Sequence, residues 1–121
     1  MAGAAGKTER PYVPAIVAEG RFVFVSGQIP ICDGQLVQGD IAEQTRAVMA
    51  NIASILESAG ATLADVVRCG VFLADLDRLP EFNEAYTAAF PSRLPTRTAV
   101  GAVLRGYDVE IDCIAVLPGS R

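Results

Sequence analysis

Histidine is absent from this sequence, and its absence removes several kinds of active site. Hydrolases in which a histidine base activates a serine or cysteine are excluded, and zinc loses its commonest protein ligand. Any chemistry must therefore use arginine, carboxylates, hydroxyls, backbone groups and water. We expect the protein to work without a metal ion and without a cofactor.

Cysteine is scarce, and its spacing fits neither a disulfide framework nor a metal site. The three residues are Cys32, Cys69 and Cys113, an odd number spread over the chain with no CxxC pair. Free thiols are typical of a reducing compartment, so we expect a cytoplasmic protein.

Positive charge is also in short supply. The chain has 10 basic and 14 acidic residues, a net charge of −4, and no stretch rich in lysine or arginine. A nucleic-acid partner is unexpected, because such binding depends on neutralising phosphates. No apolar run approaches the ~20 residues of a membrane-spanning helix, so we expect no membrane partner either.

What the sequence does contain is typical of one globular domain. Its 121 residues are 51% hydrophobic and 20% charged, enough for one core and too few for two ordinary domains. We expect a single domain over residues 1–121, with flexible tails at residues 1–9 and 117–121.

Two helices are predicted. The first spans Asp40 to Gly60, where Asp40 and Glu43 form a capping-box pattern and Gly60 suits a C-terminal cap. The second begins at Asp77-Arg78-Leu79-Pro80 and ends at Pro91. The residues expected on the buried faces are Ile41, Thr45, Val48, Ile52, Ile55 and Ala59 in the first helix and Phe82, Tyr86, Ala89 and Phe90 in the second.

Runs of β-branched and aromatic residues predict the strands. We expect them at Tyr12–Ala18, Arg21–Gly27, Val66–Leu73, Thr96–Val103 and Val109–Val116. Ile29 to Gly34 is predicted to be a loop, followed by a few paired residues at Leu36-Val37. The last two strands would flank a turn at Arg105-Gly106-Tyr107. The order predicts an α+β fold, a mixed sheet with two helices on one face.

Two helices cover only one face of such a sheet, yet the strand Val66–Leu73 is apolar on both sides. A large exposed apolar face is unusual in a monomer, so self-association is the simplest way to cover the other side.

Arg97 and Glu110 are the strongest candidates for chemistry. Arg97 lies inside a strand, and its guanidinium matches a carboxylate with two parallel hydrogen bonds. Glu110 shares one strand face with Asp112, Ile114 and Val116, where a carboxylate can handle protons or orient water. Taken alone, each residue is more often simply solvated.

Ser26 and Gly27 end a strand, where a hydroxyl and backbone amides can line a cleft, although a plain turn is the simpler interpretation. Asn83 occupies a helix interior, where asparagine is mildly unfavourable. Tyr12 and Tyr86 are most simply packing residues.

Several motifs together resemble the RidA (YjgF) family over roughly Arg10 to Val116. They are Phe24-Val25-Ser26-Gly27-Gln28-Ile29-Pro30, Gly39-Asp40-Ile41, Phe82-Asn83-Glu84-Ala85-Tyr86, Pro95-Thr96-Arg97-Thr98 and Val109-Glu110-Ile111-Asp112-Cys113-Ile114-Ala115-Val116. The resemblance implies a chorismate-mutase-like α+β fold and a homotrimer, with a central barrel and clefts between subunits.

The resemblance also implies an activity, the hydrolysis of 2-imino acids and their enamine tautomers, of the 2-aminoacrylate and 2-iminobutanoate type, to 2-oxo acids and ammonia. By position, Arg97 would bind the carboxylate and Glu110 would activate water. Tyr12, Ser26, Gly27 and Asn83 would line the substrate pocket.

Two other functions stay open. The first is an endoribonuclease or translation inhibitor, against which the acidic balance and the missing histidine argue. The second is a non-catalytic, metabolite-binding or chaperone-like trimer. If Thr96–Val103 and Val109–Val116 formed a hairpin, Arg97 and Glu110 would lie roughly 16 Å apart, which favours a site shared between chains.

Overall fold

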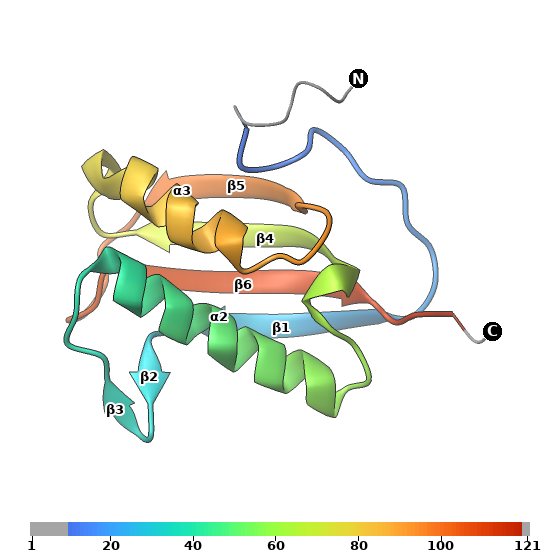
Figure 1. Cartoon of the computed structure of the whole chain (residues 1–121), viewed down its shortest axis with the longest axis horizontal. Helices are drawn as coiled ribbons and strands as arrows, with labels where there is room; N and C mark the ends of the chain where they lie inside the picture. Colours follow the sequence, from blue (N-terminus) through green and yellow to red (C-terminus); the bar gives the residue numbers. More distant parts are fainter. Residues whose placement is uncertain (1–9, 120–121) are drawn as a thin grey trace.

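A four-stranded sheet backed by two helices forms the protein, as the computed structural model of residues 10–119 shows (Figure 1). Residues 1–9 and 120–121 of the expected tails lie outside the described part of the chain. The strands of the sheet are β1 (Phe22–Gln28), β4 (Val66–Leu73), β5 (Thr96–Gly101) and β6 (Val109–Val116). The predicted α+β fold, with both helices on one face, is confirmed.

The long helix α2 (Ile41–Ser58) begins as its sequence predicts. The Asp40 side chain accepts from the Glu43 amide, and the Glu43 side chain accepts from the Asp40 amide, both at 2.9 Å. This reciprocal pair satisfies two amides that a helix start leaves without intrahelical partners. After the helix, Gly60 has a φ of 91°, a left-handed conformation that glycine adopts without strain.

The shorter helix α3 (Leu79–Ala88) follows a 3-10 turn, η2 (Leu76–Arg78), and has a proline in its first turn. A second 3-10 turn, η1 (Leu63–Asp65), precedes β4. Both helices bury one face against the sheet. Two of the residues predicted for the buried face of α2, Ile55 and Ala59, are exposed instead, because the contact with the sheet runs through Met49 and Leu56.

The strand order is β1-β6-β4-β5, so the two strands last in sequence are not neighbours. The hypothesis that they form a hairpin is wrong. β4 lies between them, antiparallel to β6 and parallel to β5. The reason is α3, which carries the chain from β4 over the helix-covered face and returns it as a parallel edge strand, the usual connection for parallel neighbours.

The predicted strand Tyr12–Ala18 is also wrong, since this segment forms no strand. It runs past the β5 edge and around one end of the sheet (Figure 1). Pro11 and Pro14 have no amide hydrogen for a ladder, and Val13 donates one bond to the Pro95 carbonyl at 3.2 Å.

A small hairpin occupies the region expected to be mostly loop. β2 (Ile31–Cys32) pairs with β3 (Gln35–Leu36) around Asp33 and Gly34, whose φ angles of 54° and 79° suit a tight hairpin turn. Of the Leu36-Val37 pair expected to join a ladder, only Leu36 does so. Asn51 of α2 holds this region by donating to the Ile29 and Ile31 carbonyls, at 3.2 and 2.9 Å.

The sheet face opposite the helices, here called the open face, carries apolar side chains that no described element covers. Phe24 is 73% exposed, and Phe22 and Val100 are also exposed. At its centre, Arg68 and Asp112 form an ion pair at 3.8 Å. None of the helices within residues 10–119 is both long and apolar enough to cross a bilayer.

Candidate active site

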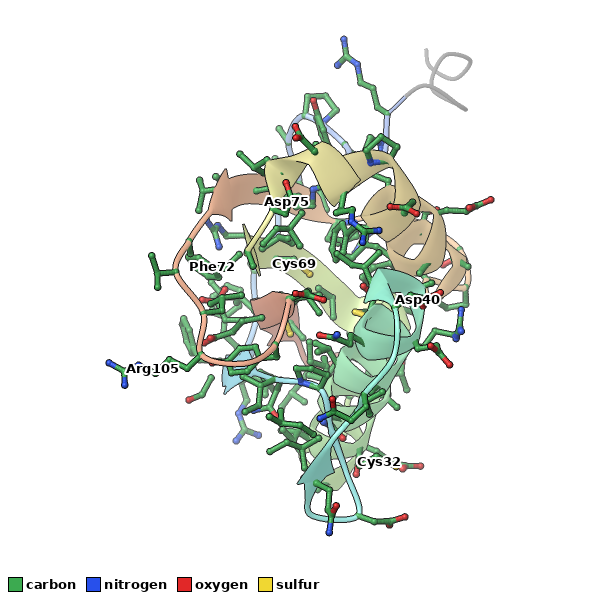
Figure 2. All side chains as sticks on the ribbon, turned by 90° about the vertical axis from the view of Figure 1, so that its left-hand side faces the viewer. Cys32, Asp40, Cys69, Phe72, Asp75 and Arg105 are labelled. Carbon is green, nitrogen blue, oxygen red and sulfur yellow. The ribbon has the colours of Figure 1, made fainter. Side chains whose placement is uncertain are left out.

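Strand register assigns each candidate residue to one face of the sheet. Cys69 of β4 pairs with Cys113 of β6 on one side and with Arg97 of β5 on the other. Residues paired in register share a face, and both cysteines are buried beneath the helices. Arg97 therefore lies on the helix-covered face. Figure 2 shows Cys69 on the helix side of the sheet and Phe72 on the other side.

Three aromatic rings surround the Arg97 guanidinium. Its central carbon lies 5.1 Å from the ring centroid of Tyr86, 5.6 Å from that of Tyr12 and 5.7 Å from that of Phe82. Each distance is within the range of a cation–π interaction. The rings shield the cation from water, and this burial lowers the pKa of Arg97. Arginine starts from so high a pKa that it remains a cation at neutral pH.

Asn83 fixes the orientation of the same guanidinium. Its side-chain oxygen accepts a hydrogen bond from Arg97 Nη1 at 2.8 Å. An arginine has five N–H donors in a planar fork, so this contact leaves donors for a carboxylate. Hydrogen bonds between ions strengthen where water is excluded, so the aromatic surroundings favour tight carboxylate binding.

Two of the three rings around Arg97, those of Phe82 and Tyr86, come from α3. Phe82 and Tyr86 are four residues apart on one face of α3, and Phe90 follows four residues later, just beyond the end of the helix. The Tyr86 ring stacks on Phe82 with centroids 5.3 Å apart and meets Phe90 edge-on at 5.0 Å. Tyr86 and Phe82 are fully buried, so they form a rigid floor under the arginine.

The two buried cysteines beside this floor are poor nucleophiles. Burial raises the pKa of Cys69 to about 11 and that of Cys113 to about 12. The reactive form of a cysteine is its thiolate, which these environments disfavour at neutral pH. Cys69, the strand neighbour of Arg97, and Cys113, the strand neighbour of Cys69, both belong to the hydrophobic core and serve packing.

Glu110 belongs to the open face. Its neighbours Val109 and Ile111 are fully buried under the helices, and strand side chains alternate, so Glu110 points the other way. Its register partner is Phe72. The carboxylate lies against Gly27, where an added Cβ would collide with Oε2. Its other oxygen, Oε1, accepts from the Tyr107 hydroxyl at 3.4 Å.

Ser26 and Gly27 lie in an irregularity of β1. The pairing of β1 with β6 shifts between Val25 and Gln28, so the two residues form a bulge, and both are exposed. Bulges commonly re-aim the backbone next to binding sites. Because a Cβ at position 27 would push the Glu110 carboxylate out of its present place, this bulge and Glu110 form one local unit.

The predicted site residues thus fall into two groups. Tyr12 and Asn83 join Arg97, whereas Gly27 and the adjacent Ser26 accompany Glu110. Arg97 and Glu110 lie three residues apart along the strands and two strands apart across the sheet. Their Cα atoms are therefore about 14 Å apart, at ~3.3 Å per residue and ~4.8 Å per strand. They also point to opposite faces, so one chain does not bring them to one small molecule.

Sequence reasoning missed three residues that the structure adds to these groups. Phe82 and Tyr86 were recognised only as packing residues, and Tyr107 only as part of a turn. A signal existed for the first two, since the strand–helix–strand order around α3 places its buried side over the neighbouring parallel strand. The sequence contains no comparable signal for Tyr107.

Known proteins resemble this chain over nearly its whole length. The family model described as endoribonuclease L-PSP matches residues 3–117. A RutC family protein of Pyrococcus abyssi is 46% identical over 108 residues, covering 88% of this chain and 84% of its own. The human 2-iminobutanoate/2-iminopropanoate deaminase is 36% identical over 110 residues, covering 88% and 80%. The crystal structure of E. coli TdcF with bound serine superposes with a TM-score of 0.75 at 29% identity, covering 91% and 97%.

Proposed function

This chain belongs to the endoribonuclease L-PSP family, also called the YjgF/RidA family, and on this premise we propose that it hydrolyses 2-imino acids to 2-oxo acids and ammonia. The observation that carries the proposal is the Arg97 site. A cation fixed by Asn83 and shielded by three rings suits a small carboxylate. The name of the human relative, an imine deaminase, supports the same reaction.

The reaction needs little beyond positioning. Arg97 holds the substrate carboxylate, so the imine carbon is presented to a water molecule. Glu110 takes a proton from that water as its oxygen bonds to the carbon, and returns a proton to the nitrogen. The resulting amino alcohol expels ammonia and leaves the 2-oxo acid. All of these roles use residues of this chain, so we expect activity without a metal or a cofactor.

We propose that Arg97 and Glu110 meet across a subunit boundary in a homotrimer. Within one chain they point to opposite faces of the sheet, about 14 Å apart. The exposed apolar side chains of the open face give a reason to associate, and β5 lies at the sheet edge. A neighbouring subunit packed there would bring its Glu110 group to this chain's Arg97 group.

We propose that the protein works in a reducing compartment such as the cytoplasm. The three cysteines are free, and Cys32 is exposed at the tip of the β2–β3 hairpin, where an oxidising environment would modify it.

The experiment that tests the function is ammonia release from imines generated in situ by an amino-acid oxidase, with and without the protein. We expect faster release, unchanged after exhaustive treatment with EDTA. Binding of 2-oxo acids without turnover would identify a metabolite-binding trimer instead. Cleavage of RNA without imine turnover would support the alternative that the family description names.

Native mass measurement tests the assembly. We expect three times the mass of one chain at micromolar concentration. The variant Phe24→Asp should shift the protein to monomer, because burying a phenylalanine contributes ~2 kcal/mol and each subunit loses one. The matched control is Ile55→Asp, which changes a partly exposed hydrophobic residue on α2 and should leave the trimer intact. A wild-type protein that is only monomeric would contradict the shared site.

Glu110→Gln tests the role of the carboxylate. The change keeps the shape of the side chain but removes its charge and its ability to accept a proton. We expect kcat to fall by about 10²- to 10³-fold, a typical contribution of a general base. The dissociation constant of a 2-oxo acid, measured by calorimetry, should change little. Weaker oxo-acid binding at an unchanged rate would mean that Glu110 binds the substrate.

A further inference from the structure

Tyr107 occupies an unusual place beside the Glu110 group. It lies in the connection from β5 to β6, directly after Gly106, whose φ of 90° turns the chain. Its side chain is half-buried, and its hydroxyl is 3.4 Å from Glu110 Oε1. The phenol is the donor and the carboxylate the acceptor, so the contact combines a neutral donor with an ion.

The Glu110 carboxylate is confined on its other side as well. Oε2 lies where a Cβ on residue 27 would be, so the glycine bulge of β1 receives that oxygen. With Tyr107 at Oε1, the carboxylate is enclosed between a hydroxyl and a backbone surface. Such confinement selects one orientation of the Glu110 carboxylate, which has to take a proton from a water molecule.

The connection that carries Tyr107 is itself fixed to α2. Gln44 accepts from the Asp108 amide at 2.8 Å and donates to the Asp108 carboxylate at 3.0 Å. The same amide group of Gln44 donates to the Gly39 carbonyl at 3.0 Å, and Gln44 is 6% exposed. Asp108 also accepts from the Ala74 amide at 3.0 Å. Residue 107 is therefore attached to an anchored neighbour.

We propose that Tyr107 is a positioning residue for the imine hydrolysis, holding Glu110 in the orientation in which it takes a proton from water. The inference rests on the proposed function. The distance of 3.4 Å is long for an O–H···O bond, and hydrogen bonds in active sites commonly tighten once a substrate is bound.

A double-mutant cycle tests this role. Tyr107→Phe removes the hydroxyl and keeps the ring. We expect kcat to fall about tenfold with KM nearly unchanged, the size expected for losing one hydrogen bond to a charged group. Because Tyr107 acts through Glu110, the double variant Tyr107→Phe/Glu110→Gln should be no slower than Glu110→Gln alone. Additive losses, or a normal kcat in Tyr107→Phe, would overturn the proposal.

Arg105→Gln is the matched control, since it alters the same connection and keeps the hydroxyl. The Arg105 side chain extends away from the sheet in Figure 2. We expect the kcat of this variant to equal that of the wild type. A loss equal to that of Tyr107→Phe would mean that the connection as a whole, and not the hydroxyl, supports the rate.

Titration of the tyrosine separates failure of this inference from failure of the proposed function. Burial raises the pKa of Tyr107, and the negative charge of Glu110 raises it further. In Glu110→Gln the pKa of Tyr107 should therefore fall, as followed by NMR of ring-labelled tyrosine assigned with Tyr107→Phe. A wild-type protein that releases no ammonia overturns the function and, with it, the kinetic role. If the wild type is active but the pKa of Tyr107 is the same in Glu110→Gln as in the wild type, the contact is overturned and the proposed function is not.

Discussion

Arg97→Ala should abolish imine turnover while the protein stays folded. We expect kcat/KM to fall by about 30- to 4000-fold, because removing one partner of a buried charge pair typically costs 2–5 kcal/mol. Affinity for 2-oxo acids should fall with it, since they carry the same carboxylate. The measurements are ammonia release, calorimetric titration with a 2-oxo acid, and circular dichroism to show that the fold is retained.

Arg97→Lys sharpens this test, because it keeps the positive charge. A lysine ammonium lacks the planar fork that pairs with Asn83 and a carboxylate at once, and it stacks less well on aromatic rings. We expect a loss of about 10²-fold. Arg93→Ala is the control, since Arg93 is exposed and donates a long hydrogen bond of 3.5 Å to the Val66 carbonyl. Near-normal turnover by Arg97→Ala would contradict the imine-hydrolase mechanism itself.

Two inactive variants should restore activity to each other when their subunits are exchanged. If each cleft takes Arg97 from one subunit and Glu110 from the next, every mixed trimer of Arg97→Ala and Glu110→Gln subunits contains one intact cleft. An equal mixture at full exchange should then recover about one quarter of the wild-type rate, as expected for a closed ring of head-to-tail contacts. Exchange can be followed by native mass measurement, with one variant labelled by a heavy isotope.

A second mixture serves as the control. Subunits that carry both substitutions are mixed equally with wild-type subunits. A shared cleft needs two wild-type neighbours, so about one quarter of the activity should remain, whereas a cleft within one chain would leave about half. A first mixture that stays inactive after full exchange would contradict the shared cleft.

The elements themselves could be predicted from the sequence, because their signals are local. The capping box at Asp40 and Glu43 marks the start of α2, and the apolar run from Val66 to Leu73 coincides with β4. Pairing is less local. The strand predicted before β1 was wrong because its apolar residues are interrupted by prolines, and the hairpin of β5 with β6 was wrong because sequence neighbours were taken as spatial neighbours.

In the candidate site, too, the residue types could be predicted from the sequence, but their arrangement in space could not. Arg97 and Glu110 attract attention by residue type, and the family motifs assign them roles. That Arg97 and Glu110 point to opposite faces of the sheet follows from the strand register. This register is set by the pairing of β4 with β5 on one side and with β6 on the other. The hydrogen bonds that attach the segment carrying Tyr107 to α2 join Gln44 and Asp108, which are 64 residues apart. Such long-range side-chain pairs leave no periodic pattern in a sequence.

The position of β6 in the middle of the sheet has a consequence for biosynthesis. β1 and β4 both pair with β6, which follows them and every other element of the sheet in the chain. While the ribosome is still making β6, the earlier strands lack their central partner, and their apolar surfaces stay unpaired. The sheet therefore closes only once β6 has emerged, and a nascent chain that ends before Val109 leaves the edges of β1 and β4 that face β6 without a partner.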